Sequence, residues 1–304
     1  MKPPFPTVLQ FFQRSWRGGC LLAAALLLRL PAGGAETTTE APGGTLCVMS
    51  YNLRFASPTP PNAWPQRRPL LTGLIGRLAP DVIGTQEGVF AQLQDIATDL
   101  PDYQWIGLGR EGGSKGEFMA VFYRKDRLEP LAFDHFWLSD TPEVTGSATW
   151  GNTYKRMVTW VRFRDRRTRA EFWFFNTHFD HQVETARVKS AELLRRRIAA
   201  LDPHLPVVLT GDFNAAAGTS EAWKILTQDG FLHDTWQTAR ERRGEGIGTF
   251  NDFKAVRPLG PRIDWIMTRG EVTTDRVEIV VDERDGQFPS DHFPVVTHLR
   301  LGGK

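Results

Sequence analysis

Acidic and amide side chains follow directly after an apolar stretch in the segment PVVLTGDFNAAAGT, residues 206–219. Residues 207–209 read as a short buried strand, and Asp212 and Asn214 follow it, two positions apart. Because residues two apart on a strand face the same side, these side chains can point together. The pattern predicts a carboxylate and an amide presented at the tip of a rigid strand.

The same kinds of side chain end other apolar stretches of the chain. Mg²⁺ prefers oxygen ligands, and amide or imidazole N–H groups can bond phosphate oxygens. Converging carboxylates, amides and imidazoles therefore suit a hard divalent cation together with a phosphate group. The strand-end residues of these types are Asn52, Glu87, Asn176, His178, Asp180, His181, Asp212, Asn214, Asp264, Asp291 and His292.

Strands and helices must alternate to position these residues. The spacing of apolar residues predicts helices over 65–80, 89–100, 183–201 and 219–230. Apolar strands fill most of the remaining chain, with a continuous run of them between residues 103 and 181. One-sided helices with apolar strands favour two packed sheets with helices outside, a single α/β domain over 45–302.

The first 35 residues have the layout of a secretory signal peptide. A basic start is followed by an apolar run over 20–28 and by small residues that end at Ala35, where cleavage is expected. The apolar run is short for a membrane span, and Arg29 disfavours an uncleaved anchor. We therefore expect an exported bacterial protein, periplasmic or extracellular, with a linker over 36–44 and no stable membrane span after cleavage.

Loss of the signal peptide changes the sign of the formal charge. Four of the 37 basic residues precede Glu36 and none of the 35 acidic ones does, so 33 basic residues remain against 35 acidic ones. This balance does not favour a nucleic acid as the partner, although a local basic patch could still bind one. Cys47 is then the last cysteine, so no internal disulfide is expected. We expect a monomer.

Six short motifs carry a resemblance to a known family. SYNLR, TQE, NTHFDH, LTGDFN, RIDWIM and SDHFPV occur in the order seen in the endonuclease/exonuclease/phosphatase superfamily, which has the DNase-I-like fold. The resemblance covers residues 45–301 and is strongest to secreted bacterial members. It implies a four-layer αββα sandwich of two mixed, mainly antiparallel sheets with outer helices.

The resemblance also implies a metal site. Glu87 resembles the principal metal ligand, Asn52 the amide beside it, and Asp291 a further residue of the same site. The implied cofactor is Mg²⁺, with Mn²⁺ as the alternative. Whether one or two ions act differs among family members, so both arrangements stay open.

Five residues resemble the catalytic groups of the family. Asp212 resembles the residue that orients or deprotonates the attacking water, Asn214 the amide that stabilises the pentacovalent phosphate, and His178 a phosphate-binding histidine. His292 resembles the imidazole that faces the scissile phosphate, with Asp264 as its carboxylate partner. Either Asp212 or His292 could be the general base. Taken singly, Asp212 and Asn214 could also form an Asx turn or a helix cap, and His178 could be a core histidine.

Three further residues are candidates for substrate contacts. Arg156 precedes a strand and could bond a phosphate through two N–H groups. Asn251, in GTFNDF, could line the site, as could Asp180. The alternatives are a surface arginine and, for Asp180, a surface or indirect role.

The residues and the resemblance together predict a divalent-metal-dependent hydrolase that cleaves a phosphate mono- or diester by in-line attack of water. The partner is then a phosphate-ester substrate of undetermined identity. A nuclease of the same family, of the DNase or 3′–5′ exonuclease type, is the first alternative. A protein of this fold that binds a phosphorylated ligand without turnover is the second, although the residues expected for metal binding and catalysis are all present.

Overall fold

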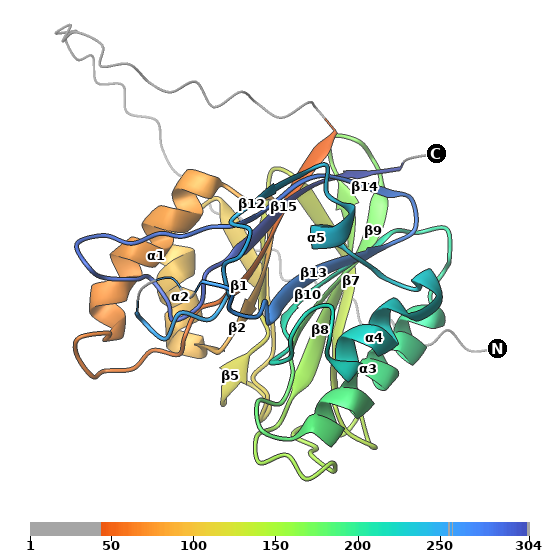
Figure 1. Ribbon diagram of the computed structural model, residues 1–304, viewed down its shortest axis with the longest axis horizontal. Helices are drawn as coiled ribbons and strands as arrows, with labels where there is room; N and C mark the ends of the chain where they lie inside the picture. The colour runs from red at the N-terminus through yellow and green to blue at the C-terminus, as the bar shows by residue number, and fades with distance from the viewer. Residues whose placement is uncertain (1–43, 255, 257, 303–304) are drawn as a thin grey trace, which may run out of the picture.

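The computed structural model describes residues 44–254, 256 and 258–302 (Figure 1). The expected signal peptide lies outside the described residues, as does the expected linker except for Gly44. The first sheet has seven strands, with β1 next to β2 at its centre. In spatial order they are β12 (Glu241–Arg243), β14 (Val272–Ile279), β15 (Val295–Leu301), β1 (Thr45–Asn52), β2 (Val82–Gln86), β6 (Val121–Arg124) and β4 (Tyr103–Ile106).

The second sheet has six strands and places β10 between β13 and β9. Its order is β11 (His233–Asp234), β13 (Asp264–Arg269), β10 (Val207–Asp212), β9 (Glu171–His178), β8 (Met157–Asp165) and β7 (Leu128–Trp137). A short antiparallel pair, β3 (Gly88–Val89) and β5 (Glu117–Phe118), lies apart from both sheets. The pairs β1–β2, β9–β10 and β12–β14 are parallel and the other pairs are antiparallel, so the expected mixed, mainly antiparallel sheets are confirmed.

Helices cover the outer face of each sheet (Figure 1). The two helices α1 (Trp64–Leu78) and α2 (Phe90–Asp99) share a core with β1 and β2. The helices α3 (Glu184–Ala199) and α4 (Glu221–Thr227) share another with β8, β9 and β10. A third core lies between the sheets, giving the expected αββα layering. The remaining helical turns are η1 (Gln228–Gly230) and α5 (Thr235–Thr238).

The alternation of side chains along the central strands explains these layers. In β9, Phe172 and Phe174 face the core between the sheets, whereas Trp173 and Phe175 face the core under α3. Both faces of this strand are therefore apolar, as period-two alternation in a sandwiched sheet requires. The FWFF run, residues 172–175, is therefore sheet core and offers no surface on which a base could stack.

The two sheets are in close contact at Asn176, two residues before the end of β9. The Asn176 side chain of β9 lies between the sheets, where its Nδ2 donates to the carbonyl oxygens of Thr85 (2.8 Å) and Ala120 (3.0 Å). Its Oδ1 accepts from Gln86 Nε2 at 2.7 Å. Asn176 is thus fully bonded inside the sandwich, so it holds the sheets together and does not reach the edge of the sheet.

Gly84 on β2 makes this approach possible, and we expect Gly84→Ala to lower the free energy of unfolding by about 2–4 kcal/mol. A Cβ there would lie 2.6 Å from Asn176 Oδ1 and would also overlap Thr210 Oγ1. Urea unfolding of the variant measures the loss. Gly73→Ala on α1 is the matched control, because its Cβ would meet only Arg77 Nη1 at 3.9 Å. Equal stability of the two variants would contradict the close approach.

The long helices and strands agree with those expected from the sequence, whereas the short elements β3, β5, β11, β12 and α5 were not expected. Elements of two to four residues carry too little periodicity to predict. Within the part of the chain that the structure describes, no helix is long and apolar enough to cross a membrane. Cys47 is unpaired.

Candidate active site

Strand register places three polar residues next to one another at one end of the second sheet. Asp212, the last residue of β10, pairs with His178 of β9 on one side and with Asp264 of β13 on the other. All three side chains are almost fully buried. Three strands far apart in the sequence therefore end at one point with a carboxylate, an imidazole and a second carboxylate.

Asn52 connects this point to the first sheet. Asn52 ends β1, and its Nδ2 donates to Glu87 Oε1 and to Asp212 Oδ2, both at 3.0 Å. Its Oδ1 accepts from the Arg54 backbone N–H at 3.0 Å, so this oxygen is turned away from Glu87. Asn52 is completely buried. It therefore holds two carboxylates from different sheets at a fixed separation.

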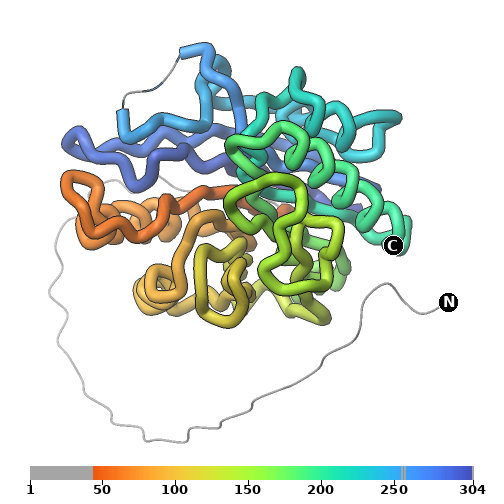
Figure 2. Tube along the Cα trace, turned by 90° about the horizontal axis from the view of Figure 1, so that it is seen from below, coloured from red at the N-terminus to blue at the C-terminus, as the bar shows by residue number. Residues whose placement is uncertain are grey.

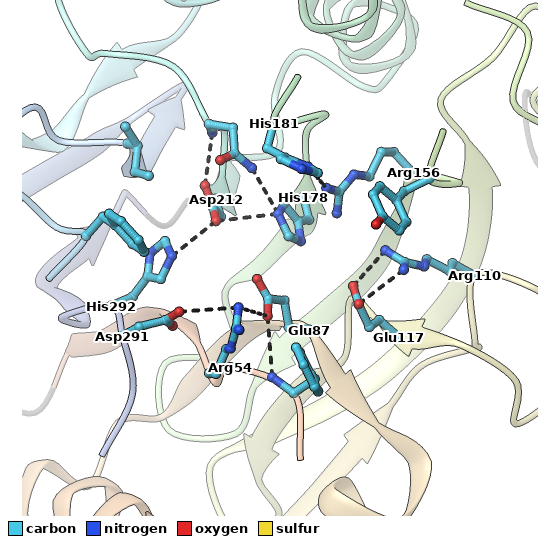
Figure 3. Close-up of a pocket in the computed structure, with 15 residues that line it drawn as sticks. Arg54, Glu87, Arg110, Glu117, Arg156, His178, His181, Asp212, Asp291 and His292 are labelled. Carbon is cyan, nitrogen blue, oxygen red and sulfur yellow. Dashed lines mark hydrogen bonds and ion pairs between the residues drawn. The ribbon is translucent and has the colours of Figure 1, made fainter. Parts of the chain in front are cut away.

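A pocket of about 360 Å³ opens at this edge of the sandwich (Figure 3). Figure 2 looks onto the same edge, where loops from the early, middle and late chain lie side by side. The expected residues that line the pocket are Glu87, Arg156, His178, Asp212, Asn214, Asp291 and His292. Asn52 and Asp264 lie buried behind them, within hydrogen-bond reach of Asp212 and His292 respectively. The structure thus brings together nine of the residues that we selected from the sequence.

Glu87, which lines the pocket, has an unusual backbone conformation. It directly follows β2, and its φ of 64° lies in the left-handed region, which glutamate rarely adopts. Its Oε2 accepts a long bond (3.4 Å) from the Phe55 N–H, and its Oε1 is held by Asn52. Strain of this kind persists where the surrounding structure demands a particular side-chain direction, often at functional sites.

His292 and Asp264 form a buried pair. His292 Nδ1 lies 2.9 Å from Asp264 Oδ2, and Nε2 lies 3.7 Å from Asp212 Oδ2. Burial by itself would lower the pKa of His292, but Asp264 and Asp212 outweigh it and raise the pKa well above the usual value. The pair therefore favours a protonated imidazole whose Nε2–H points toward Asp212 and the pocket.

His178 and Asn214 face the pocket from the other side of Asp212. Asn214 Nδ2 lies 3.0 Å from His178 Nε2 and donates to the Phe179 carbonyl at 3.1 Å. Burial, followed by the nearby arginines, lowers the pKa of His178 well below its usual value, which favours the neutral ring. The Asn214 N–H donates to Asp212 Oδ1 at 2.9 Å, so an Asx turn is present, whereas helix α4 is capped by Ser220.

The acidic residues around Glu87 fit a divalent cation. One ligand atom from each of Glu87, His178 and Asp212 lies within 4.8 Å of the others. Arg54 Nη1 lies 3.9 Å from Glu87 Oε2 and 3.5 Å from Asp291 Oδ2, so positive charge already sits between these two carboxylates. Burial, followed by Asp264, raises the pKa of Asp212 to about 7. A crowded, desolvated set of carboxylate oxygens is what a hard cation stabilises.

Comparison with known proteins identifies the family. The model of the Endonuclease/Exonuclease/phosphatase family matches residues 49–292, most of the described chain. The chain belongs to this family. Its members are hydrolases that act on phosphate esters and depend on divalent metals, so this protein is a phosphoesterase or a nuclease.

Two solved structures from Bacteroides thetaiotaomicron are similar over nearly their whole length. An endonuclease/exonuclease/phosphatase family protein is 35% identical, with a TM-score of 0.81 over 85% of this chain and 98% of that one. A mannosyl-6-phosphatase is 36% identical, with a TM-score of 0.79 over 84% of this chain and 99% of the phosphatase. An uncharacterized protein of Acanthamoeba polyphaga mimivirus is 32% identical over 160 residues, which are 50% of this chain and 59% of the viral protein.

Two residues that we expected to contact substrate serve other purposes in this family member. Asn251 is buried, donates to the Ser290 carbonyl at 3.3 Å and accepts from the Phe253 N–H at 2.7 Å, and it does not line the pocket. Asp180 is also buried, and its Oδ1 accepts the N–H groups of Gln182 and Val183 just before α3. Both side chains hold loops, and the structure does not place them among the residues that line the pocket.

Several pocket residues of this phosphoesterase escaped the sequence analysis. Arg110 and Glu117 reach the pocket because β5 pairs with β3, directly after Glu87. Their ion pair is bidentate, with distances of 2.6 and 3.1 Å. The sequence shows a Gly-rich segment between them, but it does not show the strand pairing that brings this segment to Glu87. The other residues of this kind are Arg54, Phe55, Tyr154, Phe250 and Ile263, whereas His181 was among the strand-end residues named from the sequence.

Arg67 holds the backbone of Arg54 and Phe55, two residues that line the pocket near Glu87. It is 1% exposed, and its guanidinium donates five hydrogen bonds of 2.8–3.0 Å to backbone carbonyls. The sequence showed Arg67 only as a polar residue of a helix. Its acceptors are Leu53, Arg54, Phe55, Asn62 and Pro289.

We expect Arg67→Met to lower the free energy of unfolding by about 3–5 kcal/mol, because buried carbonyls would lose a charged donor. Chemical unfolding in urea measures the loss. Arg68→Met is the matched control: this neighbour pairs with Asp95 and Asp99 at the surface and should cost less than about 1 kcal/mol. A loss at Arg67 no larger than the loss at Arg68 would contradict its supporting role.

The raised pKa of Asp212 predicts how stability depends on pH without metal. The folded state holds this proton up to a pH of about 7, whereas the unfolded state releases it near 3.8, so stability should fall as pH rises between these values. The loss is at most about 4 kcal/mol. Unfolding of the wild type and Asp212→Asn in EDTA from pH 4 to 8 tests this, because the variant should gain on the wild type as pH rises. A constant difference would contradict the shift.

Proposed function

We propose that the protein is a divalent-metal-dependent hydrolase that cleaves a phosphate ester by in-line attack of water. The observation that carries the proposal is the placement of Asp212. It is buried beside two histidines, and Asn52 fixes it to Glu87 of the opposite sheet. A water-activating carboxylate, a metal-binding carboxylate and phosphate-binding donors thus share one pocket.

Glu87 and Asp291 are the residues that would hold the cation in this proposal, with Asn52 beside them. When bound, the cation supplies positive charge that offsets the charge of the phosphate oxygens as they approach the transition state. The present orientation of Asn52 directs its Nδ2 to Glu87, so Asn52 acts by fixing this carboxylate. Burial raises the pKa of Asp291, which a neighbouring cation would reverse.

The other residues of the site accept the proton of the water or bind the phosphate group. Asp212 orients the water and accepts its proton, because its carboxylate is desolvated and its pKa of about 7 suits a base near neutral pH. His292, protonated and fixed by Asp264, donates Nε2–H to the phosphate. Asn214 and His178 line the opposite wall of the pocket and would meet the phosphate there.

The substrate that we favour is a small phosphate ester encountered outside the cytoplasm. The similarity to a mannosyl-6-phosphatase over 99% of that chain supports a phosphorylated sugar or a compound of that size. The expected charge of the exported chain does not favour nucleic acid. Export itself is part of the proposal, and an N-terminus at Glu36 in protein collected from the periplasm or medium would support it.

Hydrolysis in ¹⁸O-labelled water tests the proposed chemistry. The purified protein with Mg²⁺ is given a panel of sugar phosphates, a generic phosphomonoester, a generic phosphodiester, DNA, RNA and phospholipid. We expect turnover of a small ester, with one ¹⁸O atom entering the released phosphate group. Turnover of DNA or RNA alone would select the nuclease alternative. Tight binding of a panel compound without turnover would select the non-catalytic one.

A further inference from the structure

Arg156 is a buried cation aimed into the pocket with much of its bonding capacity unused. It precedes β8, is 4% exposed, and lines the pocket beside His181 and His178 (Figure 3). Its Nη2 donates to His181 Nδ1 at 3.1 Å. Among the described residues, Nε and Nη1 have no hydrogen-bond partner.

The other two arginines of the pocket are already neutralised. Arg110 forms a bidentate pair with Glu117, and Arg54 lies between Glu87 and Asp291. Within the described chain no carboxylate oxygen lies within 4.0 Å of the Arg156 nitrogens. Burial is the main cause that lowers the pKa of Arg156, as expected of a cation without a counter-charge. Leaving two N–H groups of such a cation unbonded costs free energy that an anion in the pocket would return.

We propose that Arg156 is an anion subsite for the terminal oxygens of a phosphate monoester, and that it makes the protein a phosphomonoesterase. The inference rests on the proposed function and specifies its substrate class. A monoester has three non-bridging oxygens and nearly two negative charges at neutral pH. One edge of the planar guanidinium, formed by the second N–H of Nη2 and an unbonded N–H of Nε or Nη1, offers two parallel donors that match two such oxygens.

A phosphodiester fits this subsite poorly. Its second ester group leaves only two non-bridging oxygens, which the cation and His292 of the proposed function also require, so N–H groups of Arg156 would stay unbonded and buried. A site built to bond a group rejects an analogue that lacks it, because its own polar atoms are left unpaired. The Arg156 side chain is held in place for this selection by His181 and by the Tyr154 ring, whose centroid lies 5.9 Å from the guanidinium carbon.

Two substrates with the same leaving group separate this role from a structural one. We expect Arg156→Met to lower kcat/KM for p-nitrophenyl phosphate by about 100-fold, the effect of losing two charge-assisted hydrogen bonds. For bis(p-nitrophenyl) phosphate the loss should be less than about 5-fold. Arg164→Met, at the far end of β8, is the control and should change neither. Equal losses on both substrates would overturn the proposal.

Inorganic phosphate tests the subsite without turnover and separates it from the proposed function. Calorimetric titration of the Mg²⁺-loaded protein should show at least about 10-fold weaker phosphate binding in Arg156→Met. Arg156→Lys keeps the positive charge but not the planar pair of N–H donors, so its phosphate affinity should lie between those of the wild type and Arg156→Met. This second variant keeps the test valid if Arg156→Met fails to fold. Wild-type affinity in both variants would overturn the subsite even if hydrolysis is intact. Absence of hydrolysis with Arg156-dependent phosphate binding would instead refute the proposed function alone.

Discussion

Replacement of Asp212 by Asn should lower kcat by three to four orders of magnitude at saturating Mg²⁺, while the protein stays folded. The carboxylate is the group that orients and deprotonates the water, and an amide keeps its shape without its basicity. The loss corresponds to about 4–5 kcal/mol of transition-state stabilisation. The rate is measured with the best ester of the panel, alongside near-ultraviolet circular dichroism to confirm native packing.

Asp180→Asn is the matched control for this result. Asp180 is equally buried and lies near the same strand ends, but its carboxylate holds only the backbone ahead of α3. An asparagine oxygen can accept the same bonds, so the change in kcat should be less than about 5-fold. Similar losses in both variants would mean that any buried charge here matters equally and that Asp212 has no special role.

Replacement of Glu87 by Gln should weaken Mg²⁺ binding by about 100-fold. The hydrogen bond from Asn52 and the left-handed backbone of Glu87 turn the Glu87 carboxylate toward Asp212, and the substitution removes the negative charge of this carboxylate. Calorimetric titration of metal-stripped protein measures the affinity, and activity of the variant should partly return at high Mg²⁺ concentration.

Glu117→Gln serves as the comparison for metal binding. Glu117 lines the same pocket, but its carboxylate is occupied by the Arg110 pair. Its loss should change the Mg²⁺ affinity by less than about 3-fold. Equal losses of Mg²⁺ affinity in Glu117→Gln and Glu87→Gln would mean that the metal site has been assigned to the wrong carboxylate.

The residues found from the sequence are those whose positions follow from strand geometry. Asp212, His178 and Asp264 stand at strand ends, and their register makes them neighbours. Apolar runs that end in polar residues are visible in one sequence because burial stops where the strand leaves the core. The contact of β1 with the other sheet was implied only by family resemblance, since periodicity does not say which edges meet.

Asp180 and Asn251 show that loops decide the direction of side chains next to a strand end. Asp180 is two residues from His178, but β9 ends at His178, so the two no longer share a face. Phe250 forms an isolated bridge to His292 and its ring faces that imidazole, at 5.1 Å between centroids, which turns Asn251 the other way. Loops set these directions through their own hydrogen bonds, which a single sequence does not display.

Arg67 and Arg110 were missed for a different reason. Each acts through partners distant in the sequence, such as Pro289 for Arg67, and each stands in a segment of ordinary composition. A buried arginine in a helix or a hairpin has the same sequence signature as a solvated one. Only the packed structure shows that Arg67 and Arg110 are buried.

The most direct test of the central claim is the rate of phosphate-ester hydrolysis as metal is removed and returned. The purified protein is stripped with EDTA, dialysed and titrated with Mg²⁺ while release of p-nitrophenol from p-nitrophenyl phosphate is followed. We expect no turnover without metal and a saturable return of activity as Mg²⁺ is added, with the half-saturating Mg²⁺ concentration raised in Glu87→Gln. Full activity in the stripped protein would contradict this expectation.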